Sequence, residues 1–166
     1  MEQHFLTAEA KLGVLVQAAR VGRGDRVLEL GSGVGTVAAA LKRYAPPCNL
    51  ILVELEPHLA GALRVAFPNV TVLQEDALGV LERLEADIIL SNLPHTFTEA
   101  VLARLNRKTF RRAVVAVYAR DDVELLAHEA GNLILHPLLT LDEDDFTPPQ
   151  PFKSKLILVT PLTQRA

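Results

Sequence analysis

The chain has 166 residues, of which 49% are hydrophobic and 22% charged, and its formal net charge is −3. This length and composition predict one domain over residues 1–166, with residues 1–24 as an N-terminal helical segment packed on the core. The single cysteine, Cys48, excludes an internal disulfide and fits a reducing cytoplasm. No apolar stretch approaches the ~20 residues of a membrane span, and the start lacks a signal-peptide pattern. The five histidines lack metal-ligand spacing, so no metal is predicted.

Helix and strand patterns alternate along the chain. An opening helix is predicted from Thr7 to Arg20, because Leu12, Leu15 and Val16 share one face. Short apolar strand patterns follow, and helical patterns separate all of them except the last two. The predicted strands cover residues 27–30, 50–53, 70–73, 86–90, 114–117, 133–135 with 138–139, and 156–159. The predicted helices cover about 35–44, 57–66, 77–85, 97–106 and 121–130.

This order predicts an α/β fold with a seven-stranded, mostly parallel sheet and helices on both faces. No helix separates the last two strands, so they form a hairpin, and the seventh strand, residues 156–159, is antiparallel. In an open parallel sheet, ligands bind at the carboxyl ends of the strands. Polar or glycine-rich breaks follow the first four strands, and we expect these breaks to meet in one crevice.

A strand that runs into three alternating glycines is the most informative pattern. It reads Val27-Leu28-Glu29-Leu30-Gly31-Ser32-Gly33-Val34-Gly35. Glycine permits a positive φ and lets a ligand approach bare backbone, and the helix that follows turns its N-terminus toward that ligand. A dinucleotide fingerprint would need its third small residue at Thr36. An acidic residue before G-x-G-x-G instead resembles motif I of class I S-adenosylmethionine (SAM) methyltransferases, and the alternative is a tight strand–helix turn without a ligand.

Carboxylates close the second and third strands. Glu54 follows the strand at 50–53, at the spacing where a ribose-binding carboxylate follows a glycine loop. We therefore expect Glu54 to accept hydrogen bonds from both ribose hydroxyls. Asp76 follows the strand at 70–73 and is placed to accept from the adenine amine of the cofactor. A lone carboxylate at a strand end is more often a turn or cap residue, so this prediction depends on the joint pattern.

Three further segments carry a family signature. They are Gln3-His4-Phe5-Leu6, Ser91-Asn92-Leu93-Pro94-His95, and Phe146-Thr147-Pro148-Pro149 with Ser154. In the same order, they resemble the Q-N-F-L, N-L-P-Y and F-x-P-P…S segments of the ribosomal-RNA adenine N6-dimethyltransferases, which include the macrolide-resistance methyltransferases. The resemblance spans essentially the whole chain. It implies a Rossmann-like class I methyltransferase fold, SAM as cofactor, and methylation of an adenine amine in RNA or a ribosomal particle, in the cytoplasm.

The resemblance and the strand-end pattern together define the candidate site. The catalytic candidates are Asn92, Leu93, Pro94 and His95. The cofactor-binding candidates are His4, Leu6, Gly31, Ser32, Gly33, Glu54, Leu55, Asp76, Ala77 and Asn92. The acceptor candidates are His95, Phe97 and Phe146.

The chemistry of adenine methylation needs an amide at this place. The exocyclic amine is a poor nucleophile, because its lone pair is delocalised into the ring. The side-chain oxygen of Asn92 and a peptide carbonyl can accept its two hydrogens and favour the sp³ form, whose lone pair attacks. Pro94 fixes the turn. Alignment of amine, methyl and sulfur supplies much of the acceleration, so no strong general base is required.

Two residues depart from the family pattern. The distribution of charged residues also bears on which acceptor the site can take. His95 stands where the family has Tyr, and His4 stands where it has Asn. The chain also shows no counterpart of the family's C-terminal helical domain. The acidic run Asp142–Asp145 is expected on the side of the site, where it should repel phosphate. The one basic cluster is expected at the opposite edge and comprises Arg104, Arg107, Lys108, Arg111 and Arg112.

Two other functions stay open on the sequence alone. The first is methylation of a small-molecule or phospholipid amine, because phosphatidylethanolamine N-methyltransferases share a Phe-Leu start and a Ser-x-Leu-Pro loop. The second is a SAM-binding subunit without its own activity. Asn92 favours base methylation over the first alternative, and the complete Asn-Leu-Pro loop disfavours the second.

Overall fold

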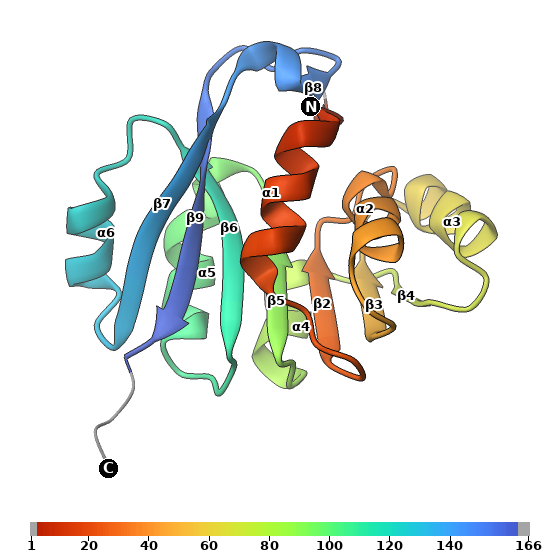
Figure 1. Ribbon diagram of the computed structural model, residues 1–166, viewed down its shortest axis with the longest axis horizontal. Coiled ribbons are helices and arrows are strands. Elements are labelled where there is room, and N and C mark those ends of the chain that lie inside the picture. The colour runs from red at the N-terminus through yellow and green to blue at the C-terminus, as the bar shows by residue number, and fades with distance from the viewer. Residues whose placement is uncertain (1–2, 163–166) are drawn as a thin grey trace.

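The computed structural model describes residues 3–162, which form a seven-stranded sheet and a separate two-stranded sheet (Figure 1). The strands are β1 (Phe5–Leu6), β2 (Arg26–Leu30), β3 (Asn49–Val53), β4 (Thr71–Leu73), β5 (Ile88–Ser91), β6 (Arg112–Tyr118), β7 (Leu133–Leu141), β8 (Phe146–Thr147) and β9 (Ser154–Pro161). The helices are α1 (Glu9–Ala19), α2 (Thr36–Tyr44), α3 (Pro57–Ala66), α4 (Ala77–Arg83), α5 (Thr98–Leu105) and α6 (Val123–Glu129), with 3-10 turns η1 (His95–Phe97) and η2 (Glu143–Asp145).

The strand order of the large sheet is β4-β3-β2-β5-β6-β9-β7. The first five strands in this order run parallel, whereas β9 lies antiparallel between β6 and β7. The predicted α/β fold with an antiparallel seventh strand is thereby confirmed. Strand β2 lies between β3 and β5, and Leu30 at its end pairs with Ser91. The glycine loop after β2 and the Asn-Leu-Pro loop after β5 are consequently neighbours.

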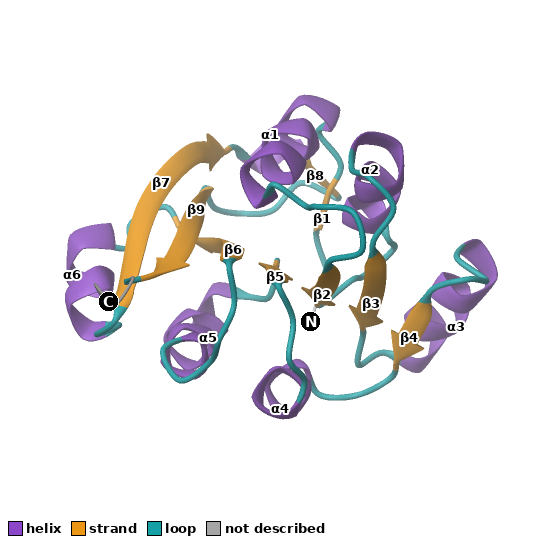
Figure 2. Ribbon diagram, turned by 60° about the horizontal axis from the view of Figure 1, so that its bottom comes forward, coloured by secondary structure: helices purple, strands orange, loops and turns teal. Residues whose placement is uncertain are grey.

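Helices cover both faces of this sheet (Figure 2). One apolar core joins α1 and α2 to the sheet and includes Leu12 and Leu41. A second core on the opposite face joins α4 and α5 to the sheet and includes Leu81 and Leu102. Because the central strands are covered on both sides, their sequences are continuous apolar runs rather than alternating ones.

The structure corrects some predicted boundaries. The helix predicted at 121–130 is α6, Val123–Glu129, because the carboxylate of Asp122 accepts hydrogen bonds from the amides of Glu124 and Leu125 and caps it there. The helix predicted from residue 97 is preceded by the 3-10 turn η1 and begins at Thr98. The two apolar pieces predicted at 133–139 are one strand, β7, with a register shift between Pro137 and Leu139.

The small sheet joins two segments far apart in the sequence. Strands β1 and β8 pair antiparallel, with Phe5 opposite Thr147 and Leu6 opposite Phe146. The amide of Thr7 donates to the carbonyl of Asp145 at 2.9 Å and extends this pairing. We call residues 4–7 and 145–148 together the strap. It lies over the carboxyl ends of the large sheet, at the top of Figure 1.

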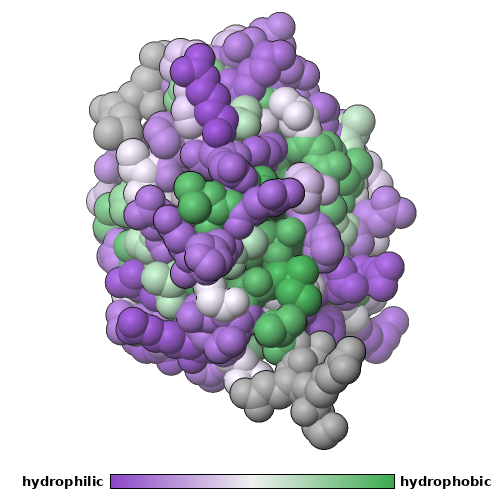
Figure 3. Space-filling view, turned by 90° about the vertical axis from the view of Figure 1, so that its left-hand side faces the viewer, coloured by the Kyte–Doolittle hydropathy of each residue, from purple (hydrophilic) through white to green (hydrophobic). Residues whose placement is uncertain are grey.

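Strand β7 forms one edge of the large sheet, since only β9 pairs with it. Ile134 and Leu138 of this strand are half-buried, and Leu125 of the neighbouring α6 is exposed. Figure 3 views the molecule from this side and shows a hydrophobic area bordered by hydrophilic residues. Within residues 3–162, no helix is long and apolar enough to cross a membrane.

Candidate active site

The glycine loop is contacted from two sides. Gly31 and Gly33 have φ values of +73° and +54°, in the left-handed region that favours glycine. A Cβ on Gly31 would lie 2.7 Å from the side chain of Leu93, and a Cβ on Gly33 would lie 2.7 Å from the ring of Phe5. Glycine is thus required at both positions because the Asn-Leu-Pro loop and the strap pack directly on this backbone.

Glu54 at the end of β3 is fixed toward the glycine loop. Its side chain is buried, with 7% exposed, and Oε2 accepts a hydrogen bond from the amide of Gly33 at 2.8 Å. Oε1 accepts from the amide of Glu56 at 2.9 Å. Each carboxylate oxygen has a further lone pair, so the same oxygens can also accept hydrogen bonds from two neighbouring hydroxyls. The position suits the ribose-binding role predicted for Glu54.

Glu29 is a second buried carboxyl beneath this loop, and the sequence reasoning did not include it among the site residues. It is 3% exposed, and Oε2 has no hydrogen-bond partner within the part of the chain that the structure describes. Burial, reinforced by the negative charge of Glu54, raises the pKa of Glu29 to about 8. The side chain is therefore protonated at pH 7. Its signal in the sequence is a lone acidic residue inside the apolar strand β2.

The remaining predicted residues on the β2–β4 side surround the same loop. Ser32 is buried, and its hydroxyl donates to the carbonyl of Glu29 at 3.3 Å. Leu55, directly after Glu54, has an exposed side chain. Asp76 is exposed and caps α4, because its Oδ2 accepts from the amide of Gly79 at 2.8 Å, and Ala77 is the first residue of that helix.

The Asn-Leu-Pro-His loop continues β5 beside the glycine loop. The amide of Asn92 lies 3.4 Å from the carbonyl of Leu30, so the loop starts against the end of β2. Asn92 and Leu93 are half-buried, whereas Pro94 and His95 are exposed. The side-chain amide of Asn92 forms no hydrogen bond with any of residues 3–162 and remains available to a bound molecule.

The strap carries three of the predicted residues, His4, Leu6 and Phe146. Leu6 and Phe146 are paired across β1 and β8, so their side chains share the face that packs into the core. They are 1% and 4% exposed, and neither offers a side chain to a cofactor or an acceptor in this structure. Phe5 points to the other face and contacts the glycine loop. His4 lies on the same segment, and its Nδ1 is 3.0 Å from the carbonyl oxygen of Pro148.

Three aromatic rings gather at the carboxyl ends of β5 and β6 and the amino end of the antiparallel β9. The centroid of the His95 ring lies 5.0 Å from that of Tyr118, in a stacked arrangement, and 5.1 Å from that of Phe152, edge to face. The Tyr118 and Phe152 centroids are 5.4 Å apart. We call these three residues the aromatic cluster. Phe97, the other predicted acceptor residue, is 38% exposed and lies outside this cluster.

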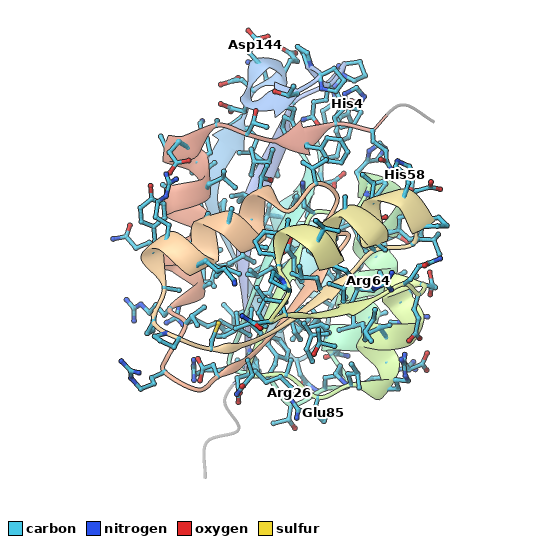
Figure 4. All side chains as sticks on the ribbon, turned by 90° about the vertical axis from the view of Figure 1, so that its right-hand side faces the viewer. His4, Arg26, His58, Arg64, Glu85 and Asp144 are labelled. Carbon is cyan, nitrogen blue, oxygen red and sulfur yellow. The ribbon has the colours of Figure 1, made fainter. Side chains whose placement is uncertain are left out.

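Charges at the two edges of the sheet are partly paired. Figure 4 shows His4 and Asp144 at one end of the molecule and Arg26 and Glu85 at the other. At the end with Glu85, Lys108 binds this carboxylate at 3.1 Å, so part of the predicted basic cluster is neutralised. At the end with Asp144, Lys153 binds Asp142 at 2.7 Å and lowers the pKa of that carboxyl.

A cation lies beside the aromatic cluster, apart from the basic cluster predicted from the sequence. The guanidinium of Arg120 lies 5.9 Å from the centroid of the Tyr118 ring. The Nζ of Lys155 donates to the carbonyl of Asp121 at 2.5 Å, next to Arg120 in the sequence. No group of three or more His, Cys, Asp or Glu residues suited to a metal ion occurs within residues 3–162.

Comparisons with known proteins agree with this geometry. The sequence pattern of the family "Ribosomal RNA adenine dimethylase" matches residues 1–127. A probable ribosomal RNA small subunit methyltransferase A of Methanosarcina mazei is 35% identical over 69% of this chain and 42% of its own length. The ribosomal RNA small subunit methyltransferase A of Bordetella petrii is 29% identical over 96% of this chain and 67% of its own length. This chain thus spans only part of these relatives.

Solved structures show the same fold. A dimethyladenosine transferase from Plasmodium falciparum superposes with a TM-score of 0.82 and 18% identity, over 95% of this chain and 63% of that chain. The 23S rRNA methyltransferase ErmE gives a TM-score of 0.81 and 19% identity, over 96% of this chain and 72% of that chain. With the match to residues 1–127, these findings show that the chain belongs to the ribosomal RNA adenine dimethylase family.

Proposed function

We propose that this protein is a SAM-dependent N-methyltransferase that acts on the exocyclic amine of an adenine in ribosomal RNA, in the cytoplasm. One observation carries the proposal. The Asn-Leu-Pro loop packs directly on Gly31, where a Cβ would lie 2.7 Å from Leu93. The Asn92 amide, which has no hydrogen-bond partner within residues 3–162, and the glycine loop thus lie at the ends of the adjacent strands β5 and β2.

The residues around the glycine loop fit SAM. The buried Glu54 presents two oriented oxygens to a ribose, and one of them also accepts from the amide of Gly33. Within residues 3–162, only Oδ2 of Asp76 accepts a hydrogen bond, so Oδ1 can accept from an adenine amine, and Leu55 directly after Glu54 offers an exposed apolar side chain. When bound here, SAM supplies an electrophilic methyl group on a sulfonium.

The Asn-Leu-Pro-His loop binds and orients the acceptor. The oxygen of the Asn92 side chain accepts one hydrogen of the target amine and holds the nitrogen lone pair toward the glycine loop. Pro94 fixes the backbone, because its carbonyl accepts from the amide of Phe97 at 2.9 Å and closes the η1 turn. His95, the first residue of this turn, lies at the surface, where an acceptor ring can stack on it.

The family supports RNA as the acceptor, and the relatives' names refer to ribosomal RNA. A specific observation favours a second candidate, a cationic small-molecule or phospholipid amine. A carboxylate lies beside the aromatic cluster, because Asp121 Oδ2 accepts a hydrogen bond from the amide of Tyr118 at 3.0 Å. Arg120 beside the Tyr118 ring argues the other way, because it suits an anionic acceptor.

Transfer of tritiated methyl groups from SAM distinguishes these candidates. The purified protein is incubated with ribosomal particles, total RNA, lipids and small molecules from cells, and the labelled RNA is digested to nucleosides. Label in N6-methyladenosine or N6,N6-dimethyladenosine supports the proposal. Label confined to lipids or small amines supports the second candidate. SAM binding without transfer to any fraction identifies a SAM-binding subunit. The Asn92→Ala variant serves as the inactive control.

A further inference from the structure

The aromatic cluster is assembled from three neighbouring strand ends. Strand β5 ends at Ser91, which pairs with Val115, and β6 continues past this point to Tyr118. Tyr118 in turn pairs with Ser154 at the start of β9, two residues after Phe152. Gln150 Nε2 donates to Ser154 Oγ at 2.9 Å within the structure and fixes the segment that carries Phe152. The ends of three neighbouring strands therefore bring together the segments that carry these rings.

Tyr118 and Phe152 together hold the ring of His95. The Tyr118 ring lies against one face of the imidazole, with 28° between the planes, and Phe152 meets it edge on at 82°. Both arrangements are favourable for aromatic pairs. His95 is nevertheless exposed, so the imidazole is supported from the protein side and open toward solvent.

We propose that Tyr118 and Phe152 are positioning residues that turn His95 into a rigid stacking surface for the planar ring of the acceptor. This inference rests on the proposed function and deepens it. An imidazole on a loop offers a small π-face and loses side-chain freedom when a ring stacks on it. Two supporting rings remove that freedom before the acceptor arrives and so reduce the cost of binding.

Arg120 adds a preference for a nucleotide. Its side chain is exposed, lies 5.9 Å from the Tyr118 ring and forms no ion pair with residues 3–162. A cation beside a ring-stacking surface matches a base that carries a phosphodiester. A small aliphatic amine has neither a ring to stack nor a negative charge to pair, and a phospholipid amine has a phosphate but no ring, so the cluster favours a nucleotide acceptor.

The test measures ring stacking without turnover. A short single-stranded RNA carries 2-aminopurine at one position, and S-adenosylhomocysteine is present throughout. Stacking of 2-aminopurine on the cluster quenches its fluorescence, and the titration gives Kd. We expect Tyr118→Leu and Phe152→Leu each to raise Kd about three- to ten-fold, and Tyr118→Phe, which keeps the ring, to stay within about two-fold of wild type.

Tyr44→Leu is the matched control, because Tyr44 is the only other tyrosine, is exposed on α2 and hydrogen-bonds Glu9 far from the cluster. S-adenosylhomocysteine binding, measured by calorimetry, should be equal in all variants. An unchanged Kd for both Tyr118→Leu and Phe152→Leu would overturn the inference.

The same variants separate failure of the inference from failure of the proposed function. If the wild-type protein methylates adenine and the Tyr118→Leu and Phe152→Leu variants have the same KM for RNA, only the positioning role is overturned. Wild-type protein that neither quenches 2-aminopurine nor methylates adenine overturns both. A raised KM with unchanged kcat in the leucine variants, restored in Tyr118→Phe, supports the inference, because general loss of structure would not be rescued by the ring alone.

Discussion

Replacing Glu29 by glutamine should stabilise the protein, and increasingly so as the pH rises. The pKa of Glu29 is about 8 in the folded chain against 4.5 for an ordinary glutamate. Between these values the folded state holds a proton that the unfolded chain has released, so the free energy of unfolding falls as pH rises. The contribution of this bound proton to the free energy of unfolding is fully present below about pH 4.5. It is lost by the time Glu29 ionises in the folded chain near pH 8. A glutamine stays neutral and lacks this dependence.

The magnitude follows from the two pKa values. They differ by about 3.5, and each pH unit between them corresponds to about 1.4 kcal/mol, so Glu29→Gln gains at most about 5 kcal/mol over wild type above pH 8. Near pH 5 the two proteins should differ by less than about 1 kcal/mol. Relaxation around the buried group reduces the gain but leaves its sign and its pH window unchanged.

Urea unfolding at several pH values between 5 and 8.5 measures this difference. The control is Glu129→Gln, an exposed glutamate at the end of α6, whose difference from wild type should be constant with pH. Parallel curves for Glu29→Gln and wild type would refute the reasoning, because they would show that Glu29 titrates alike in the folded and unfolded chains.

Three further substitutions test the candidate site. Glu54→Ala should weaken SAM binding by about 1.5–3 kcal/mol, measured by calorimetry with the exposed Glu56→Ala as control, and unchanged affinity would remove Glu54 from the site. Asn92→Ala should lower kcat roughly 100-fold, or about 2.7 kcal/mol, with the urea midpoint unchanged; near-normal turnover would exclude the amide mechanism. Gly33→Ala should destabilise the loop by about 1–2 kcal/mol and speed hydrogen exchange at the Thr7 amide, because the new Cβ displaces Phe5 and with it the strap. Slow exchange at Thr7 would show that the Phe5 side chain moves aside while the strap stays paired.

The parts of the fold that sequence could predict are those with a strong local pattern. Strands β2, β3 and β5 are largely apolar runs because helices cover both their faces. The loop after β2 has glycine at every second position. The strap escaped prediction because each of its strands has two residues, too few for any periodicity. Its pairing also decides that Leu6 and Phe146 face the core and that Phe5 meets the glycine loop.

Contacts between distant residues set the rest of the site. Tyr118 and Phe152 are each unremarkable in the sequence, and only the insertion of β9 beside β6 brings both of their rings against that of His95. The buried state of Glu29 likewise depends on the covering of β2 by both layers. The carboxylate Glu54 was predictable because its role depends on the end of its own strand, and its distance from the glycine loop is encoded by one strand–helix–strand unit.

The position of β9 has a consequence for folding during synthesis of the chain. Within residues 3–162, β9 is the last strand along the chain, Ser154–Pro161, yet it lies between β6 and β7 in the sheet. While the chain is being synthesised, β6 remains an open edge with the apolar run Val114–Val117 until this final strand emerges. The rings of the aromatic cluster meet only at that moment. A nascent chain, or one that ends before β9, therefore exposes an aggregation-prone strand edge and lacks the aromatic cluster. The acceptor surface forms only when β9 enters the sheet.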